Sequence, residues 1–196
     1  MSAAKSLSIS ELAAHAGETV TLKGWLYHRR AGGKIRFLVL RDGSGYLQAV
    51  VSKAEVPEAV WNEADRATQE STLEVTGTLR LDSRAPGGVE MSVSDVKILD
   101  LCQEWPITPK EHGVDFLMSQ RHLWLRSAKQ VAILKVRSEV ESGIHDFFYT
   151  RGFTRIDSPI LTPNACEGTS TLFETQYTED ERAFLSQSGQ LYLEPA

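Results

Sequence analysis

The chain has 196 residues, of which 41% are hydrophobic and 24% charged, and its formal net charge is −5. These proportions are those of a globular protein and argue against a disordered chain or indiscriminate nucleic-acid binding. Because no apolar run reaches the length of a bilayer span and residues 1–10 lack a signal-peptide pattern, we expect a cytoplasmic protein with no membrane partner.

Alternating apolar and polar residues, separated by turn-forming residues, predict five strands in the first half of the chain. The expected strands are Thr19–Arg30, Ile35–Arg41, Tyr46–Ser52, Ser71–Leu81 and Val89–Leu99. Apolar residues recur at helical spacing from Val60 to Ala67, which predicts a short helix within Glu55–Glu70. Three strands, a helix and two strands are the element order of the OB fold, an all-β five-stranded barrel that often binds nucleic acid.

The second half of the chain is expected to form a separate domain. Residues 103–115 contain two prolines and no sustained periodicity, so we interpret them as a linker between a barrel domain, residues 1–102, and a second domain, residues 116–196. Ser127 is placed to cap a long helix that runs to about Arg151, with Gly152 ending it. The helix carries one apolar stripe, made of Ile133, Val136, Val140, Ile144 and Phe147. Such a stripe requires a partner surface.

Beyond the long helix, the sequence predicts short strands and no ordinary domain ending. Phe153–Ile156, Ala183–Ser186 and Gln190–Leu193 are expected as strand pieces. The last residues, Glu194–Ala196, contain neither a helix cap nor a charged tail. We therefore expect the second domain to be incomplete in this chain.

Basic residues are concentrated in the first two expected strands. Six Lys or Arg residues and no acidic residue lie between Thr21 and Arg41, namely Lys23, Arg29, Arg30, Lys34, Arg36 and Arg41. Phosphates favour such a positive surface, and an aromatic ring such as Phe37 and an amide such as Gln48 suit an unpaired base. The alternative is a solvated basic strand pair with Phe37 in the barrel core.

The barrel segment resembles the anticodon-binding domain of the aspartyl and asparaginyl branch of class II aminoacyl-tRNA synthetases. The resemblance is carried by Gly24-Trp25-Leu26, Arg29-Arg30, Phe37, Leu40–Gly43 and Leu47-Gln48. It implies that Phe37 stacks on the central anticodon base and that Gln48 and Arg30 contact that base and its surroundings. Since uridine is central in the anticodons for both amino acids, these residues do not separate the two branches.

The segments Gln120–Arg126, Arg151–Phe153 and Ser158–Leu161 resemble motif 1 of the same family, in which a long helix and a strand ending in proline build a homodimer. The fold implied is the start of an α+β catalytic domain with an antiparallel sheet. The residues that the resemblance assigns to the dimer interface are Arg126, Ile133, Val140, Ile144 and Pro159. The alternative is an ordinary core helix within one subunit.

Two further segments resemble the part of the family's active site that holds the amino acid. Glu167–Ser170 is similar to a mobile loop that closes over the substrate, and Ser186–Tyr192 is the most specific match in the chain. The residues that the resemblance assigns to the amino-acid substrate are Glu167, Ser170, Gln187, Ser188, Gln190 and Glu194.

Charge at this site favours asparagine as the substrate. The aspartyl enzymes have a proline where this chain has Gly189 and soon afterwards a lysine, whereas this chain has Leu193 and Glu194 and no lysine after Lys135. A carboxylate accepts hydrogen bonds from a carboxamide and repels a second carboxylate. The alternatives are a Glu194 that faces outward, and an aspartyl or non-discriminating enzyme.

The family's reaction implies asparagine, tRNA(Asn), ATP and Mg²⁺ as partners. The arginine-bearing motifs that bind ATP in class II enzymes, Phe-Arg-x-Glu and Gly-x-Gly-x-x-Arg, do not occur in this sequence. No catalytic residue can therefore be assigned, and the 196 residues alone are expected to be inactive. Cys102 and Cys166 have no companions at metal-ligand spacing, so no metal site is expected. A second alternative is a tRNA-binding and dimerisation module without catalysis.

Overall fold

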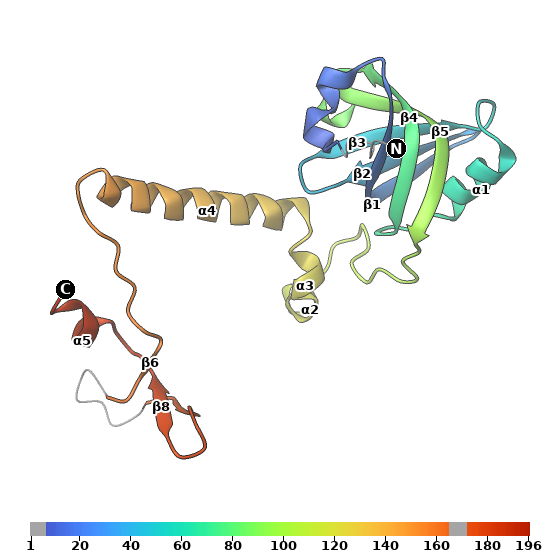
Figure 1. Ribbon diagram of the computed structural model, residues 1–196. Coiled ribbons are helices and arrows are strands. Elements are labelled where there is room, and N and C mark those ends of the chain that lie inside the picture. The colour runs from blue at the N-terminus through green and yellow to red at the C-terminus, as the bar shows by residue number, and fades with distance from the viewer. Residues whose placement is uncertain (1–6, 165–171) are drawn as a thin grey trace. The chain divides into compact units, whose positions relative to one another are not determined.

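The structure is a computed structural model that describes residues 7–164 and 172–196 (Figure 1). The chain divides into two compact units, Met1–His112 and Gly113–Ala196. The division falls within the segment 103–115.

The first unit is the expected OB-fold barrel. Its strands are β1 (Thr19–Gly32), β2 (Ile35–Arg41), β3 (Tyr46–Ser52), β4 (Thr72–Leu81) and β5 (Val89–Asp100), with α1 (Glu58–Arg66) between β3 and β4. They close in the order β1-β2-β3-β5-β4. The β3–β5 pair is parallel, whereas the other neighbouring pairs are antiparallel.

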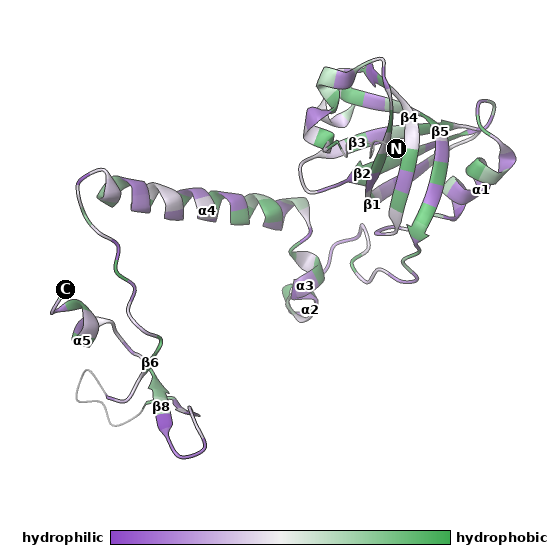
Figure 2. Ribbon diagram, in the orientation of Figure 1, coloured by the Kyte–Doolittle hydropathy of each residue, from purple (hydrophilic) through white to green (hydrophobic). Residues whose placement is uncertain are grey.

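The barrel core follows from the alternation of side chains along each strand. In β3, Leu47, Ala49 and Val51 point inward and are fully buried. Bands of hydrophobic and hydrophilic residues alternate along the barrel strands in Figure 2. Gly77 lies where β4 and β5 shift register, and a Cβ there would lie 2.3 Å from the carbonyl oxygen of Ser92, so only glycine fits.

A short 3₁₀ helix, η1 (Ile9–His15), packs on the barrel and had no counterpart in the sequence analysis. Its Leu12 is buried in the barrel core. Asp42, in the turn before β3, accepts a hydrogen bond from the backbone N–H of Ile9 at 2.7 Å and from that of Ser44 at 2.8 Å. The turn and the helix are therefore held by one carboxylate.

A buried ion pair joins β2 to the segment before β4. The Nη2 of Arg41 lies 2.6 Å from Oε2 of Glu70, and both side chains are almost completely enclosed. Glu70 has a positive φ of 66°. Its backbone N–H donates to the carbonyl of Leu26 at 2.7 Å, so the strained residue is fixed on both sides.

The second unit begins with helices and ends in a small sheet. Its elements are α2 (Val114–Ser119), α3 (Arg121–Trp124), α4 (Ala128–Tyr149), β6 (Leu161–Thr162), β7 (Glu174–Gln176), β8 (Arg182–Leu185) and α5 (Gln190–Leu193). The sheet has the order β6-β8-β7, and both pairs are antiparallel. Within the described ranges, no helix is long and apolar enough to cross a bilayer.

The long helix α4 begins and ends as the sequence predicts. The Oγ of Ser127 accepts from the backbone N–H of Gln130 at 3.5 Å. After Tyr149 the chain turns at Gly152, whose φ is 83°. The left-handed conformation costs glycine little, which explains why the helix ends there.

Two of the expected strands in the second unit are wrong. Phe153–Ile156 forms no strand and follows the turn at Gly152 without regular secondary structure. Gln190–Leu193 is the helix α5, in which the backbone N–H of Leu193 donates to the carbonyl of Gly189. The third expectation, near Ala183–Ser186, is confirmed by β8.

Candidate nucleic-acid interface

A cleft of about 480 Å³ lies on the outer face of the barrel. Its lining residues are Arg30, Ile35, Phe37, Gln48, Val50, Arg80, Asp82, Arg84, Ala85 and Glu90. Strand register brings them together: Arg30 pairs with Phe37 across β1 and β2, and Gln48 pairs with Glu90 across β3 and β5. The three residues expected to contact a base thus share one cleft.

The side chains of these three residues also contact one another. The guanidinium of Arg30 lies over the ring of Phe37, 5.4 Å from its centroid. Its Nη2 donates to Oε1 of Gln48 at 3.1 Å. Phe37 is half-buried, outside the barrel core, so the alternative that placed it there is wrong.

Glu90 is a further cleft residue that the sequence analysis did not identify. It is only 4% exposed. Its Oε2 accepts from Nε2 of Gln48 at 2.5 Å, and its Oε1 accepts from Nε of Arg80 at 2.9 Å. The sequence alone does not predict this contact. Glu90 reaches Gln48 only through the parallel β3–β5 pairing, and the sequence does not reveal the register of that pairing.

The loop between β4 and β5 forms another wall of the cleft. Arg84 donates to Asp82 through its Nε at 3.1 Å and through its Nη2 at 3.0 Å. The side-chain hydrogen bond from Arg84 is the main cause that lowers the pKa of Asp82 to about 2. Asp82 is therefore a carboxylate at neutral pH, and Arg84 is oriented by it.

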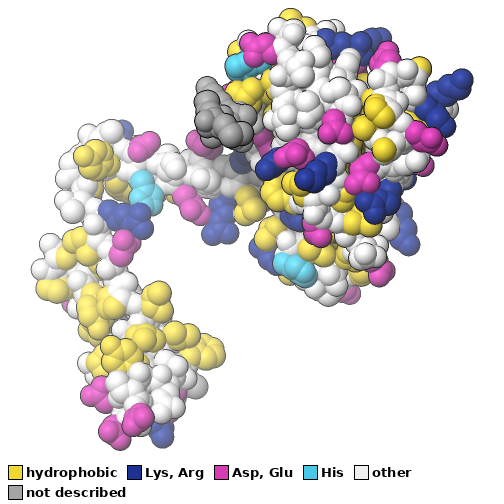
Figure 3. Space-filling model, turned by 45° about the vertical axis from the view of Figure 1, so that its right-hand side comes forward, with side chains coloured by type: hydrophobic (Ala, Val, Ile, Leu, Met, Phe, Trp, Pro, Cys, Tyr) yellow, Lys and Arg dark blue, Asp and Glu magenta, His cyan; other side chains and the backbone are white. Residues whose placement is uncertain are grey.

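The expected concentration of positive charge on β1 and β2 is only partly correct, because four of the six cations have carboxylate partners. Besides the buried Arg41, Lys23 lies 3.4 Å from Glu74, and Arg36 and Arg29 lie 2.7 Å and 3.3 Å from the same Asp65 oxygen. The hydrogen bond from Arg36 is the main cause that lowers the pKa of Asp65. Figure 3 shows Lys and Arg interspersed with Asp and Glu on one barrel face. Arg30 is the cation of this group that lines the cleft.

The residues expected to hold an amino acid lie at the C-terminal end of the second unit. Gln187 and Ser188 are exposed beside α5, and Nε2 of Gln190 donates to Oε1 of Glu194 at 2.6 Å. The backbone N–H of Gln190 donates to the Ser188 hydroxyl at 3.4 Å. Glu167 and Ser170 lie outside the described residues.

The residues expected at a dimer interface are mostly exposed within this chain. Ile133, Val140 and Ile144 are about half exposed, at 48%, 56% and 53%. Pro159 is exposed and Arg126 is half-buried. The apolar stripe of α4 is therefore not covered by the described residues of the same chain.

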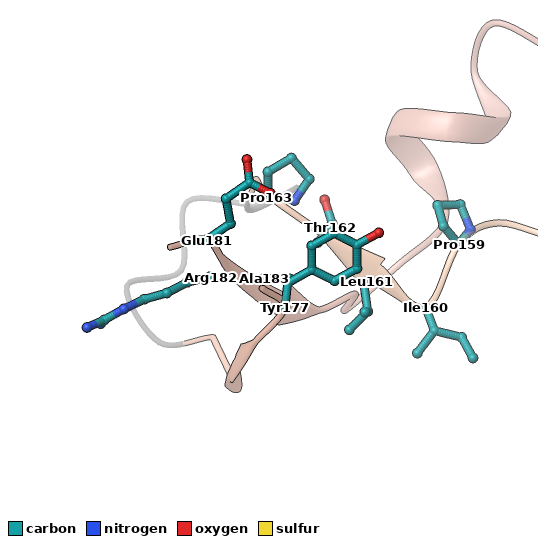
Figure 4. Close-up of a pocket in the computed structure, with 9 residues that line it drawn as sticks. All are labelled: Pro159, Ile160, Leu161, Thr162, Pro163, Tyr177, Glu181, Arg182 and Ala183. Atoms are coloured by element: carbon teal, nitrogen blue, oxygen red, sulfur yellow. The ribbon is translucent and has the colours of Figure 1, made fainter. Parts of the chain in front are cut away.

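One cleft of the second unit contains none of the described residues that were expected to hold the amino acid. It has a volume of about 720 Å³ and is lined by Pro159, Ile160, Leu161, Thr162, Pro163, Tyr177, Glu181, Arg182 and Ala183. In Figure 4 the side chain of Arg182 extends away from the other labelled side chains. Its walls are mainly apolar, and Thr162, Tyr177, Glu181 and Arg182 supply its polar side chains.

No metal site is formed by the residues that the structure describes. Among them, no three His, Cys, Asp or Glu side chains are grouped so as to hold an ion. None is therefore assigned as a Mg²⁺ ligand.

Comparison with known families gives a consistent result for both units. Residues 20–99 match the family described as OB-fold nucleic acid binding domain, and residues 113–196 match tRNA synthetases class II (D, K and N). The asparagine–tRNA ligase of Thermus thermophilus is 56% identical over 95% of this chain, and that of Sorangium cellulosum is 52% identical over 97%. The chain spans 43% of the length of each of these relatives.

Solved structures agree with the sequence relatives. The asparaginyl-tRNA synthetase of Pyrococcus horikoshii, complexed with asparaginyl-adenylate, aligns with a TM-score of 0.87 and 36% identity over 97% of this chain and 44% of that one. The corresponding Entamoeba histolytica complex aligns with a TM-score of 0.76 and 31% identity over 98% of this chain and 45% of that one.

Proposed function

The chain belongs to the class II tRNA synthetases of the D, K and N group, and from this premise we propose that it is part of an asparagine–tRNA ligase. In this proposal the barrel binds the anticodon of tRNA(Asn), and the second unit contributes dimer contacts and part of the amino-acid pocket. The cleft that holds Arg30, Phe37 and Gln48 is the observation that carries the proposal.

The cleft has the parts needed to bind one unpaired base. A base stacked on Phe37 gains about 1–3 kcal/mol, and the neighbouring Arg30 adds a cation close to the RNA backbone. Gln48 offers both a donor and an acceptor to the edge of that base. A uridine at the centre of the anticodon is the base proposed for this position.

Selection of asparagine is assigned to Glu194. A carboxamide donates to a carboxylate, whereas the side chain of aspartate repels it, at a cost of several kcal/mol in a partly desolvated pocket. The Gln190 carboxamide donates a hydrogen bond to the Glu194 carboxylate at 2.6 Å. This contact supports the assignment because the carboxamide of asparagine would donate to Glu194 in the same way. Gln187, Ser188 and Gln190, with Glu167 and Ser170, are proposed to hold the rest of the amino acid.

The reaction proposed for the complete protein has two steps. The carboxylate of asparagine attacks the α-phosphorus of ATP and pyrophosphate leaves; a terminal ribose hydroxyl of the tRNA then attacks the activated carbonyl and AMP leaves. Mg²⁺, when bound, offsets phosphate charge. The residues named above would position the amino acid and the tRNA; such catalysis depends both on positioning and on cationic stabilisation of phosphate charge.

Binding of an anticodon stem-loop to the 196-residue chain tests the anticodon assignment. We expect Phe37→Leu to weaken binding of a stem-loop with the tRNA(Asn) anticodon by about tenfold, because base stacking is lost. The control is Lys23→Gln, which removes a cation from the same barrel that is paired with Glu74 and lies outside the cleft. Fluorescence anisotropy at fixed salt measures both, and equal affinities for the two variants would refute the proposal.

A further inference from the structure

The start of α5 lies against the segment that precedes β6. Strand pairing sets this arrangement, because β6 and β8 are antiparallel neighbours with Leu161 opposite Leu185. The alignment continues beyond the strands, where the backbone N–H of Ser186 donates to the carbonyl of Ile160 at 2.8 Å. Continued further in the same direction, it brings Ser158 to the turn that begins α5.

Gly189, the N-cap residue of α5, has no room for a side chain. A Cβ at this position would lie 2.8 Å from Oγ of Ser158 and 3.1 Å from its Cβ. It would also lie 2.9 Å from Cδ1 of Leu193, but that atom ends a flexible side chain and can move aside. The Cβ of Ser158 cannot easily do so, because Pro159 restricts the backbone of the residue before it. Any residue at position 189 except glycine would therefore push the turn away from Ser158.

The turn at Gly189 determines where the following residues lie. Its carbonyl accepts from the backbone N–H groups of Tyr192 and Leu193, both at 3.0 Å, and so begins the helix. Within that helix, the carboxamide of Gln190 donates to the carboxylate of Glu194. Because α5 has only four residues, a displacement of the turn would carry both of these side chains with it.

We propose that Ser158 is a positioning residue for the amino-acid pocket, whose side chain holds the turn at Gly189 and thereby the carboxylate of Glu194. The inference rests on the proposed function, because it takes Glu194 to receive the carboxamide of asparagine. Ser158 acts through the turn and does not touch the substrate. A displacement of about 1 Å in a binding group can lower a rate by up to about a hundredfold, so the packing of this one side chain controls the use of asparagine.

Pyrophosphate exchange by variants of the complete protein tests this contact. We expect Gly189→Ala to lower kcat/KM for asparagine at least about tenfold, because the added methyl group overpacks the space beside Ser158. The KM for ATP should change by less than about twofold, since the displaced turn carries groups assigned to the amino acid only. A general disturbance of the catalytic domain would raise the KM for ATP as well.

Rescue by a smaller residue at position 158 is the result that identifies the contact. Ser158→Gly alone should lower kcat/KM for asparagine about threefold, because the turn loses its support. Independent effects would then multiply to a loss of about thirtyfold in the double variant. We expect Ser158→Gly with Gly189→Ala to lie within about threefold of the unaltered protein instead, because one side chain replaces the other. Ser158→Ala retains the Cβ at 3.1 Å and should rescue only in part.

Gly113→Ala is the matched control, because a Cβ there would meet no described atom within 4 Å. It should leave kcat/KM for asparagine unchanged. Absence of rescue in the double variant, an unchanged kcat/KM in Gly189→Ala, or a parallel rise in the KM for ATP would overturn the inference and leave the proposed function intact.

Two further outcomes also decide the inference. If Gly189→Ala does not fold, a folded and active double variant supports the contact with Ser158, and an unfolded one overturns it. If the unaltered complete protein does not activate asparagine, the proposed function and the inference fall together.

Discussion

At the scale of single residues, the carboxylate of Asp42 accepts four hydrogen bonds. Its carboxylate accepts from the backbone N–H groups of Ile9, Ser44 and Gly45 and from the Ser44 hydroxyl. Burial by itself raises the pKa of Asp42, but these hydrogen bonds outweigh it and the net pKa lies below the ordinary value of 3.8. The charged form is therefore the one that the fold prefers.

The pH dependence of this contribution follows from the sign of the shift. A carboxyl group whose pKa is lowered by folding stabilises the fold above its unfolded pKa, and the contribution is lost as the pH falls through the folded value. We expect Asp42→Ala to lower the free energy of unfolding by about 1–3 kcal/mol at neutral pH. The difference should shrink below pH 3.8.

Urea unfolding at about pH 7 and about pH 3 measures this difference. The control is Asp100→Ala. Asp100 is exposed and is the last residue of β5, so this variant should change the free energy of unfolding little at either pH. A difference between Asp42→Ala and the unaltered chain that persists unchanged at low pH would exclude the charged carboxylate as its source.

The cleft residues illustrate what sequence alone can and cannot predict at this scale. Phe37 and Gln48 could be singled out because an aromatic and an amide in neighbouring strands suit an unpaired base. Glu90 could not, since it lies 42 residues from Gln48 and meets it only through strand register. The ion pairs of Arg29 and Arg36 could not be predicted either. Their partner, Asp65, lies in α1, and the sequence does not show how that helix packs against the barrel.

At the scale of elements, α4 has an apolar stripe that the described residues of this chain leave largely exposed. None of its residues is buried, although Figure 2 shows hydrophobic bands along it. A helix of this kind gains stability by covering its apolar face. We propose that the stripe through Val140 and Ile144 faces a second copy of the protein.

A charge in the stripe should disrupt that dimer. We expect Val140→Asp to weaken self-association at least about a hundredfold, because an unpaired carboxylate would be buried at the interface. Ser138→Asp, on another face of the same helix, should have little effect. Sedimentation equilibrium measures both variants, and unchanged association of Val140→Asp would refute this use of the stripe.

The strands β2 and β3 were predicted with their observed bounds, whereas the short helices η1 and α5 were not predicted. The bounds of β2 and β3 could be predicted because each is a mainly apolar run that follows a glycine-containing turn, Gly32-Gly33 or Gly43–Gly45. The helix η1 has a local signal that the sequence analysis did not use, a capping box formed by Ser8 and Glu11. Leu12 and Asp42 also hold it against the barrel. In α5, a sequence with strand-forming residues is helical over only four positions, too few for periodicity to decide.

At the scale of the whole molecule, the 196-residue sequence contains neither of the arginine-bearing motifs Phe-Arg-x-Glu and Gly-x-Gly-x-x-Arg. We expect residues 1–196 alone to support no asparagine-dependent pyrophosphate exchange. A longer polypeptide that includes the arginine-bearing motifs should exchange with asparagine and not with aspartate. Exchange by the 196-residue chain, or a preference of the longer one for aspartate, would contradict the assignment.

The parallel contact between β3 and β5 has a consequence for how recognition and folding depend on each other. Without that contact the remaining pairs leave an open sheet, β3-β2-β1-β4-β5, with Gln48 and Glu90 at its opposite edges. A partly opened barrel would keep the ring of Phe37 and separate Gln48 from Glu90. A base bound in the proposed anticodon site would therefore favour the closed barrel by mass action.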